Sequence, residues 1–118
     1  MPQFSTLTEN KKPTLVSEYG AGGALSQHTQ TPENADFSPN ASPHPDELQA
    51  YWHRKTYEGL LEIDGLCGAF IWCLFDFSSE GRKEGDTVGE NDKGLINRTR
   101  DGFKGAYRYY HEKWNDLA

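Results

Sequence analysis

The sequence has few of the features that mark membrane, secreted or nucleic-acid-binding proteins. Its 118 residues contain no apolar run that approaches the roughly 20 residues needed to cross a bilayer. Acidic residues outnumber basic ones by 18 to 12, and the formal net charge of −6 argues against a nucleic-acid partner. The opening residues show no charged-then-apolar signal pattern, so we expect a cytoplasmic location and no membrane partner.

Cysteine is also scarce. Cys67 and Cys73 are the two cysteines of the chain, and their spacing of six matches no zinc pattern. We therefore expect two reduced core thiols and no metal site. The glycines at 20–23 lack the spacing and the lysine of a phosphate-binding loop, and we expect no cofactor.

Large aromatic residues make up a considerable share of the hydrophobic residues. Aromatic residues account for 13% of the chain, and hydrophobic residues of all kinds account for 35%. The whole chain, 1–118, has the length of one small domain. Segment 13–19 predicts a buried strand that ends on a carboxylate, Glu18, and runs into glycines. This pattern indicates a side chain presented at the rim of a sheet, although an ordinary strand with a solvated Glu gives the same pattern.

The rest of the chain repeats the order strand, long loop, helix. Segment 20–45 is irregular and rich in Gly, Ser, Thr, Asn and Pro, and it leads to an amphipathic helix expected over 46–61. Segment 66–77 is the most apolar run and predicts a strand buried on both faces. A charged, Gly-rich loop at 78–92 follows, and a second amphipathic helix is expected over 101–115.

Two consecutive βα units place the chain in the α/β class, with both long loops at the carboxyl ends of parallel strands. Chemistry in barrels and open α/β sheets takes place at that edge. Two strands and two helices cannot cover both faces of a sheet, however. We therefore infer a part of a larger assembly: a fragment, a subunit that completes a partner, or a self-completing oligomer.

Four segments together resemble glycoside hydrolase family 2. Segment 17–21 (SEYGA) resembles the nucleophile segment of that family, and 70–77 (FIWCLFDF) resembles its last barrel strand. Segment 90–95 (ENDKGL) is similar to its N-x-K-G-L motif, and 104–110 (KGAYRYY) to its final helix. Within the family, the similarity is greatest to bacterial β-galactosidases.

The resemblance implies the last two βα units of a (β/α)8 TIM barrel, which is incomplete unless other chains complete it. It also implies retaining hydrolysis of terminal β-D-galactosides, with Glu18 as the nucleophile. The hydrogen-bond donor that such a carboxylate needs could come from Tyr19 or from elsewhere. The acid/base of the family lies in an Asn-Glu pair on an earlier strand, whereas pairs such as Glu33-Asn34 and Glu90-Asn91 have the reverse order. Alone, the chain should be nearly inactive, since general acid catalysis supplies roughly 10²–10⁴ in rate.

The resemblance also implies substrate-binding residues. Trp72 resembles an indole at the sugar-binding face, where indoles stack on sugar rings, although a buried barrel Trp is an equal alternative. Asn91 and Lys93 stand where β-glucuronidases hold the sugar carboxylate, which makes a β-glucuronide the alternative substrate and a solvated loop the structural alternative. His28 and His44 lie in the first loop, where a histidine either binds substrate or is solvated.

Asp76, near the end of the second strand, could bind a sugar hydroxyl or cap the following loop, and the structural role is favoured. Two functions therefore remain open. The chain is either the nucleophile-bearing part of a glycosidase, or a non-catalytic barrel fragment that binds sugar or self-associates through its strands. Carbohydrate is the expected ligand in both cases, and the expected protein partner is a second copy or the remainder of the barrel.

Overall fold

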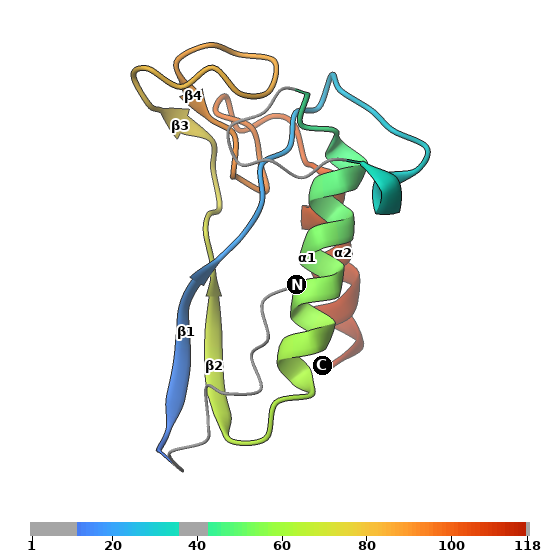
Figure 1. The fold of residues 1–118 in the computed structure, drawn as a ribbon, viewed down its shortest axis with the longest axis vertical. Helices are drawn as coiled ribbons and strands as arrows, with labels where there is room; N and C mark the ends of the chain where they lie inside the picture. The colour runs from blue at the N-terminus through green and yellow to red at the C-terminus, as the bar shows by residue number, and fades with distance from the viewer. Residues whose placement is uncertain (1–11, 36–42, 118) are drawn as a thin grey trace.

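Two parallel strands and two helices form the frame of the molecule (Figure 1). The computed structural model describes residues 12–35 and 43–117, so part of the first long loop (36–42) lies outside the described residues. The elements in chain order are β1 (Thr14–Tyr19), the 3-10 helix η2 (Pro32–Asn34), α1 (Asp46–Leu61), β2 (Leu66–Ile71), β3 (Phe77–Ser78), β4 (Glu90–Asn91) and α2 (Gly105–Asp116).

The two long strands, β1 and β2, pair in parallel, and the register of the pairing is irregular. Val16 lies opposite Ala69 and Tyr19 lies opposite Ile71, so β1 carries one more residue than β2 over this interval. Such a bulge bends a strand and changes the direction of its side chains. The short strands β3 and β4 pair antiparallel beyond the carboxyl ends of β1 and β2 (Figure 1), and they flank the expected loop at 78–92.

Helix α1 spans Asp46–Leu61, the range that the sequence predicts. Pro45 precedes it, and Asp46 and Glu47 in its first turn favour a helix start because carboxylates interact well with the exposed N–H groups there. Helix α2 begins at Gly105, whereas the sequence predicted a start at 101. The reason is a tight turn, in which the Asn97 side-chain oxygen accepts the backbone N–H of Asp101 at 3.1 Å.

Strand β2 ends at Ile71, whereas the sequence predicted a strand over 66–77. Beyond Trp72 the chain leaves β1 and pairs with residues 93–96, through bonds such as Leu95 N–H to Cys73 O at 3.0 Å and Asp76 N–H to Ile96 O at 3.0 Å. Gly94 allows this close pairing, because a Cβ there would overlap the backbone of Phe75 and Asp76. The apolar run therefore continues as an extended segment with a new partner.

The core lies between the sheet and the two helices. Leu95, Ala106 and Tyr110 are its buried centre, with Tyr19 and Ile71 among the residues packed against it. The helices cover one face of the β1–β2 sheet (Figure 1). Residues on the other face stay exposed, with Leu15 at 58% and Phe70 at 62%. The expectation that segment 66–77 is buried on both faces is therefore wrong for this chain.

The remaining sequence expectations concern the thiols and the membrane. Cys67 is exposed and Cys73 is half-buried, and neither forms a disulfide, so the expected core position is wrong for Cys67. In the described part of the chain, neither helix has the length and hydrophobicity that a membrane crossing requires.

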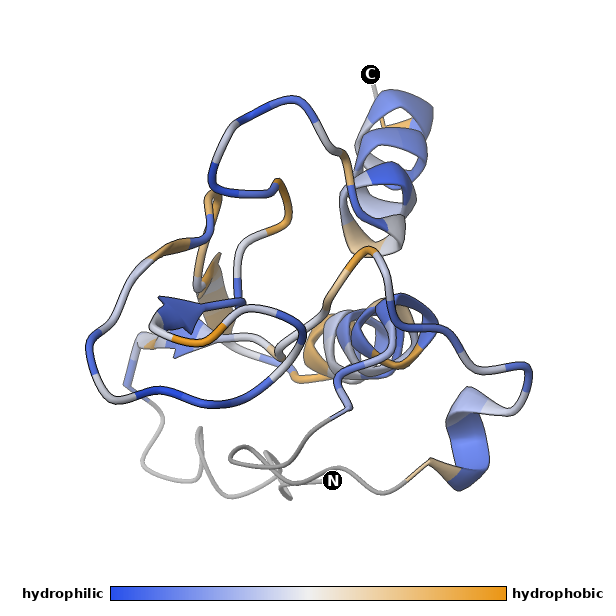
Figure 2. Ribbon diagram, turned by 90° about the horizontal axis from the view of Figure 1, so that it is seen from above, coloured by the Kyte–Doolittle hydropathy of each residue, from blue (hydrophilic) through white to orange (hydrophobic). Residues whose placement is uncertain are grey.

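Polar residues dominate the loops above the carboxyl ends of the strands (Figure 2).

Candidate active site

A cleft of about 510 Å3 opens at the carboxyl ends of β1 and β2. The cleft brings together four residues that the sequence analysis selected from three separate segments: Glu18, Trp72, Asn91 and Lys93. The other residues of its lining are Tyr19, Gly20, Phe77, Ser79 and Arg82. The end of one strand, the segment after the next and the 78–93 loop thus converge on one hollow, as expected for adjacent parallel strands.

Glu18 lies on the face of the sheet that the helices leave open. Its side chain is exposed, whereas the neighbouring Tyr19 is half-buried against the helices. The Tyr19 hydroxyl lies 2.9 Å from the Tyr110 hydroxyl, so its hydrogen bond goes to α2 and not to Glu18. Among the described residues that line the cleft, Glu18 is the single carboxylate.

Trp72 forms one wall of the cleft. Trp72 is 44% exposed in this chain, and a buried position in a complete barrel stays the alternative. The indole meets the Phe77 ring edge to face, with centroids 5.9 Å apart and an interplanar angle of 86°. The Trp72 backbone N–H donates to the Tyr19 carbonyl at 2.8 Å, which ties this wall to the end of β1. An exposed indole held in this way can stack on a sugar ring.

Asn91 and Lys93 lie in the cleft next to an arginine that the sequence analysis did not select. The Asn91 side-chain oxygen accepts the Lys93 backbone N–H at 3.0 Å, which leaves the Asn91 amide nitrogen as the group that could donate to a ligand. Arg82 donates from its Nε to Ser79 Oγ at 3.1 Å. No local pattern in the 78–92 loop distinguishes Arg82 from its charged neighbours, and only the folded loop places it in the cleft.

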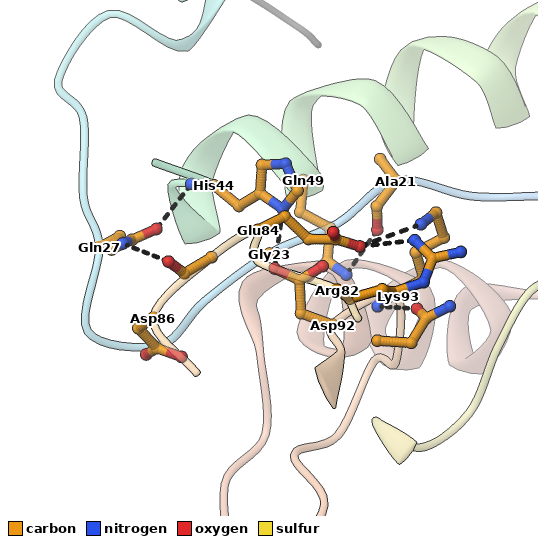
Figure 3. A network of polar contacts seen from close by, with 12 residues as sticks. Ala21, Gly23, Gln27, His44, Gln49, Arg82, Glu84, Asp86, Asp92 and Lys93 are labelled. Atoms are coloured by element: carbon orange, nitrogen blue, oxygen red, sulfur yellow. Dashed lines mark hydrogen bonds and ion pairs between the residues drawn. The ribbon is translucent and has the colours of Figure 1, made fainter. Parts of the chain in front are cut away.

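A buried glutamate, Glu84, lies behind these two cations (Figure 3). Its Oε1 is 2.5 Å from an Arg82 guanidinium nitrogen and 4.0 Å from Lys93 Nζ. The Glu84 side chain is 4% exposed, against 35% for Arg82 and 21% for Lys93. The cations therefore reach solvent in the cleft while their shared counter-ion stays inside. With Glu18, the cleft lining carries two positive charges and one negative charge.

The backbone around the cleft is held by buried polar contacts. Gln49 on α1 donates from Nε2 to the Ala21 carbonyl at 2.9 Å (Figure 3) and to the Gly94 carbonyl at 3.0 Å, and so connects the loop after β1 and the segment after β4 to one helix. His44 lies 2.8 Å from Asp92, and both side chains are 8% exposed. The solvated alternative for His44 is therefore wrong, because its imidazole is buried in a pair with a carboxylate.

Asp76 and His28 lie outside the lining of this cleft. Asp76 accepts hydrogen bonds from Lys104 Nζ at 2.8 Å and from the Gly94 backbone N–H at 2.8 Å, contacts that fit the structural role favoured from sequence. Burial raises the pKa of Asp76 to about 6 although Lys104 opposes the shift. His28 is exposed and bonds Glu47 at 2.8 Å, and this bond raises the His28 pKa. A substrate role for His28 stays a prediction.

The chemistry of these residues favours a polar, hydroxyl-rich ligand with acidic character. An indole face, an amide nitrogen and two cations surround one carboxylate. In residues 12–35 and 43–117, no group of three or more His, Cys, Asp or Glu side chains is arranged to hold a metal ion.

Sequence comparison finds a larger protein that is similar to this chain. A protein named β-glucuronidase from Bacteroides fragilis is 38% identical over 117 residues, which cover 95% of this chain. The chain is thus similar to one part of a larger protein that carries the name of a glycoside hydrolase. It spans 16% of the length of that relative. No family model matches the sequence. The sequence motifs favoured β-galactosidases within the family, whereas this relative carries the name β-glucuronidase.

Solved structures match the fold of the chain as well. A Bacteroides fragilis protein proposed to be a β-galactosidase superposes with a TM-score of 0.77 at 24% identity, over 92% of this chain and 16% of that protein. The GH2 β-galacturonidase from Eisenbergiella tayi, solved with galacturonate, gives a TM-score of 0.68 at 22% identity, over 91% and 18% of the two chains. The mixed α/β arrangement of this chain thus occurs as part of larger glycoside hydrolases.

Proposed function

We propose that the chain supplies the nucleophile-bearing part of a retaining family 2 glycoside hydrolase, with Glu18 as the nucleophile. The observation that carries this proposal is the shared cleft, in which Glu18, Trp72, Asn91 and Lys93 come from three separate segments and line one hollow. A carboxylate at the carboxyl end of a parallel strand, beside an exposed indole, is suited to attack a stacked sugar.

In the proposed reaction, the Glu18 carboxylate attacks the anomeric carbon and forms a glycosyl ester. The bond to the leaving oxygen breaks, and that oxygen takes a proton from an acid/base carboxyl group. Water then attacks the ester, loses its proton to the acid/base, and releases the sugar and the free carboxylate. Because Glu18 is the single carboxylate of the described lining, we propose that the acid/base comes from outside that lining.

We propose that the acid/base comes from the missing units of a (β/α)8 barrel. The open face of the β1–β2 sheet supports this, because Leu15 is 58% exposed and Phe70 62% exposed on the side that faces inward in a barrel. The remainder of the polypeptide or further copies of the chain would cover it. We keep the cytoplasm as the predicted location of the assembly.

For the substrate, we propose a terminal β-hexuronide, with a terminal β-D-galactoside as the second possibility. Two cations in the lining, Arg82 and Lys93, support an acidic sugar because they can pair with its carboxylate. The name of the relative at 38% identity, β-glucuronidase, supports the same substrate class. The resemblance of the sequence to bacterial β-galactosidases supports the galactoside.

A second candidate function is sugar binding without turnover. The single carboxylate in the described lining of the cleft favours it, because retaining hydrolysis needs two. In this case the chain would bind the sugar through Trp72, Asn91 and Lys93, and Glu18 would accept hydrogen bonds from sugar hydroxyls.

Covalent labelling separates the two candidates. A 2-deoxy-2-fluoro glycosyl fluoride of glucuronic acid or galactose has a leaving group that needs no protonation, so a nucleophile can react without an acid/base partner. We expect mass spectrometry to find one sugar ester on the peptide that contains Glu18, and none in Glu18→Gln. Glu80→Gln, an exposed carboxylate outside the cleft, is the matched control and should still be labelled. Sugar binding by NMR titration without any label would support the second candidate.

A further inference from the structure

The burial pattern of β1 shows that Glu18 reaches the cleft only because the strand is irregular. Thr14 and Val16 are half-buried, and Leu15 and Ser17 are exposed, as alternation in a strand requires. If the alternation continued, Glu18 would lie on the helix side with Val16, and Tyr19 would lie on the open face. The structure has the opposite arrangement, with Glu18 exposed and Tyr19 half-buried.

The extra residue of the bulge causes this exchange of faces. Three steps along β1, from Val16 to Tyr19, match two steps along β2, from Ala69 to Ile71. Ser17 and Glu18 therefore follow one another on the open face, and the side chain after them returns to the helix side. A shift of one residue in register moves every later side chain to the other face of a sheet, so the bulge must be held in place.

Tyr19 is the residue that is held immediately after the bulge. Its hydroxyl lies 2.9 Å from the Tyr110 hydroxyl on α2, and that hydroxyl lies 2.9 Å from His53 Nδ1 on α1. The Tyr110 side chain is 2% exposed and His53 is 1% exposed, so this chain of hydrogen bonds runs through the interior. The Tyr19 carbonyl also accepts the Trp72 N–H at 2.8 Å.

We propose that Tyr19, Tyr110 and His53 are positioning residues, whose hydrogen-bond chain fixes the β1 bulge and so directs Glu18 into the cleft. Tyr19 on the open face would remove one hydrogen-bond partner of the buried Tyr110 hydroxyl, which would keep its contact with His53 Nδ1, and the loss of a partner is costly for a buried polar group. The two helices therefore select the register that exposes Glu18. The role of these residues in catalysis rests on the proposed function of Glu18. Their role in fixing the bulge does not depend on that function.

Tyr110→Phe tests the inference, because it removes the central hydroxyl and keeps the ring. Tyr109→Phe is the matched control, since Tyr109 is its neighbour on α2 and its hydroxyl has one long contact, 3.5 Å to Glu58. We expect Tyr110→Phe to reduce the hydrogen-exchange protection of the Trp72 amide and to shift the NMR resonance of the Glu18 carboxyl carbon. We expect Tyr109→Phe to leave both unchanged.

The labelling reaction supplies the second readout. We expect Tyr110→Phe to lower the limiting rate of Glu18 labelling by roughly tenfold to a hundredfold, at an unchanged half-saturating sugar concentration, because misplacement of a reacting group affects rate more than affinity. Equal behaviour of Tyr110→Phe and Tyr109→Phe in both readouts would overturn the inference. If Tyr110→Phe does not fold, Tyr19→Phe decides by the same comparison.

The two readouts also separate this inference from the proposed function. Altered NMR signals at Glu18 and Trp72 in a protein whose wild type is never labelled would uphold the positioning role and contradict the nucleophile. Normal labelling of the wild type, with no change of labelling or NMR signals in Tyr110→Phe, would uphold Glu18 as the nucleophile and contradict the positioning role.

Discussion

The Lys104 amino group lies 2.8 Å from Asp76 Oδ1, and the two side chains are 1% and 9% exposed. The same amino group donates to the carbonyls of Gly23 at 2.6 Å and Asp92 at 2.9 Å, so all three of its donors are used inside the protein. Lys104 thereby holds together the loop after β1, the segment after β2 and the loop before α2. These are the segments that form the cleft.

Lys104→Met should unfold the cleft region. Removing one partner of a buried ion pair leaves the Asp76 carboxylate uncompensated, and such changes cost about 3–5 kcal/mol. Lys113→Met, at an exposed position of α2, is the matched control and should change the free energy of unfolding by less than about 0.5 kcal/mol. Urea denaturation of both variants measures the difference, and similar midpoints would contradict the central role of Lys104.

The stability of the chain should depend on pH through His53. Burial lowers the pKa of His53 from 6.5 to about 4 in the folded protein. Between these values the unfolded chain binds a proton that the folded chain does not. The stabilisation from a neutral His53 is therefore fully present above pH 6.5 and is lost as the pH falls towards 4, by up to about 3 kcal/mol.

His53→Asn isolates this contribution from that of Asp76, which has the opposite sign. Burial raises the pKa of Asp76 from 3.8 to about 6, so its contribution is fully present below pH 3.8 and is lost as the pH rises through 6. We expect the difference in free energy of unfolding between wild type and His53→Asn to shrink from pH 7.5 to pH 4. A difference that is constant with pH would mean that His53 is not kept neutral by burial.

Gly94→Ala should destabilise the extended segment beyond β2. The added methyl group would overlap the backbone of Phe75 and Asp76, and overpacking against a backbone that cannot move away costs about 1–3 kcal/mol. Gly81→Ala is the control: its φ of +85° adds strain of roughly 1 kcal/mol, but no atom lies within 4 Å of the new Cβ. Calorimetry should therefore rank Gly94→Ala below Gly81→Ala in melting temperature.

Glu84→Gln should change the charge preference of the cleft. The change removes the buried counter-ion of Arg82 and Lys93 without changing its shape, and the cations then act more strongly on an anion in the cleft. We expect the ratio of glucuronate to galactose affinity to rise roughly tenfold at low salt, and less at high salt. Glu80→Gln removes an exposed charge of the same loop and should leave the ratio unchanged.

Titration calorimetry or NMR titration of both variants with the two sugars measures this ratio. A ratio that stays constant in Glu84→Gln would mean that Arg82 and Lys93 do not contact the acidic part of the ligand, and the β-galactoside would become the favoured substrate.

The sequence by itself determined the order of the elements and most of the candidate site. The polar loops after two apolar strands predicted where side chains would converge, because parallel strands end at the same edge of a sheet. Segment 46–61 carries its own helix start, with Pro45 and two acids in the first turn, and α1 has that range. Trp72, Asn91 and Lys93 were selected from the resemblance to family 2, and each lines the same cleft as Glu18.

Only the tertiary structure decided which way Glu18 points and which charges surround it. Strand alternation alone would direct Glu18 towards the helices, and a bulge set by contacts across 91 residues, from Tyr19 to Tyr110, reverses this. Arg82 and Glu84 belong to the site because the folded loop places Glu84 within reach of both Arg82 and Lys93, which no local sequence pattern indicates. Local sequence sets backbone preference and hydrophobic period, whereas register and burial of charge depend on partners that are distant in the chain.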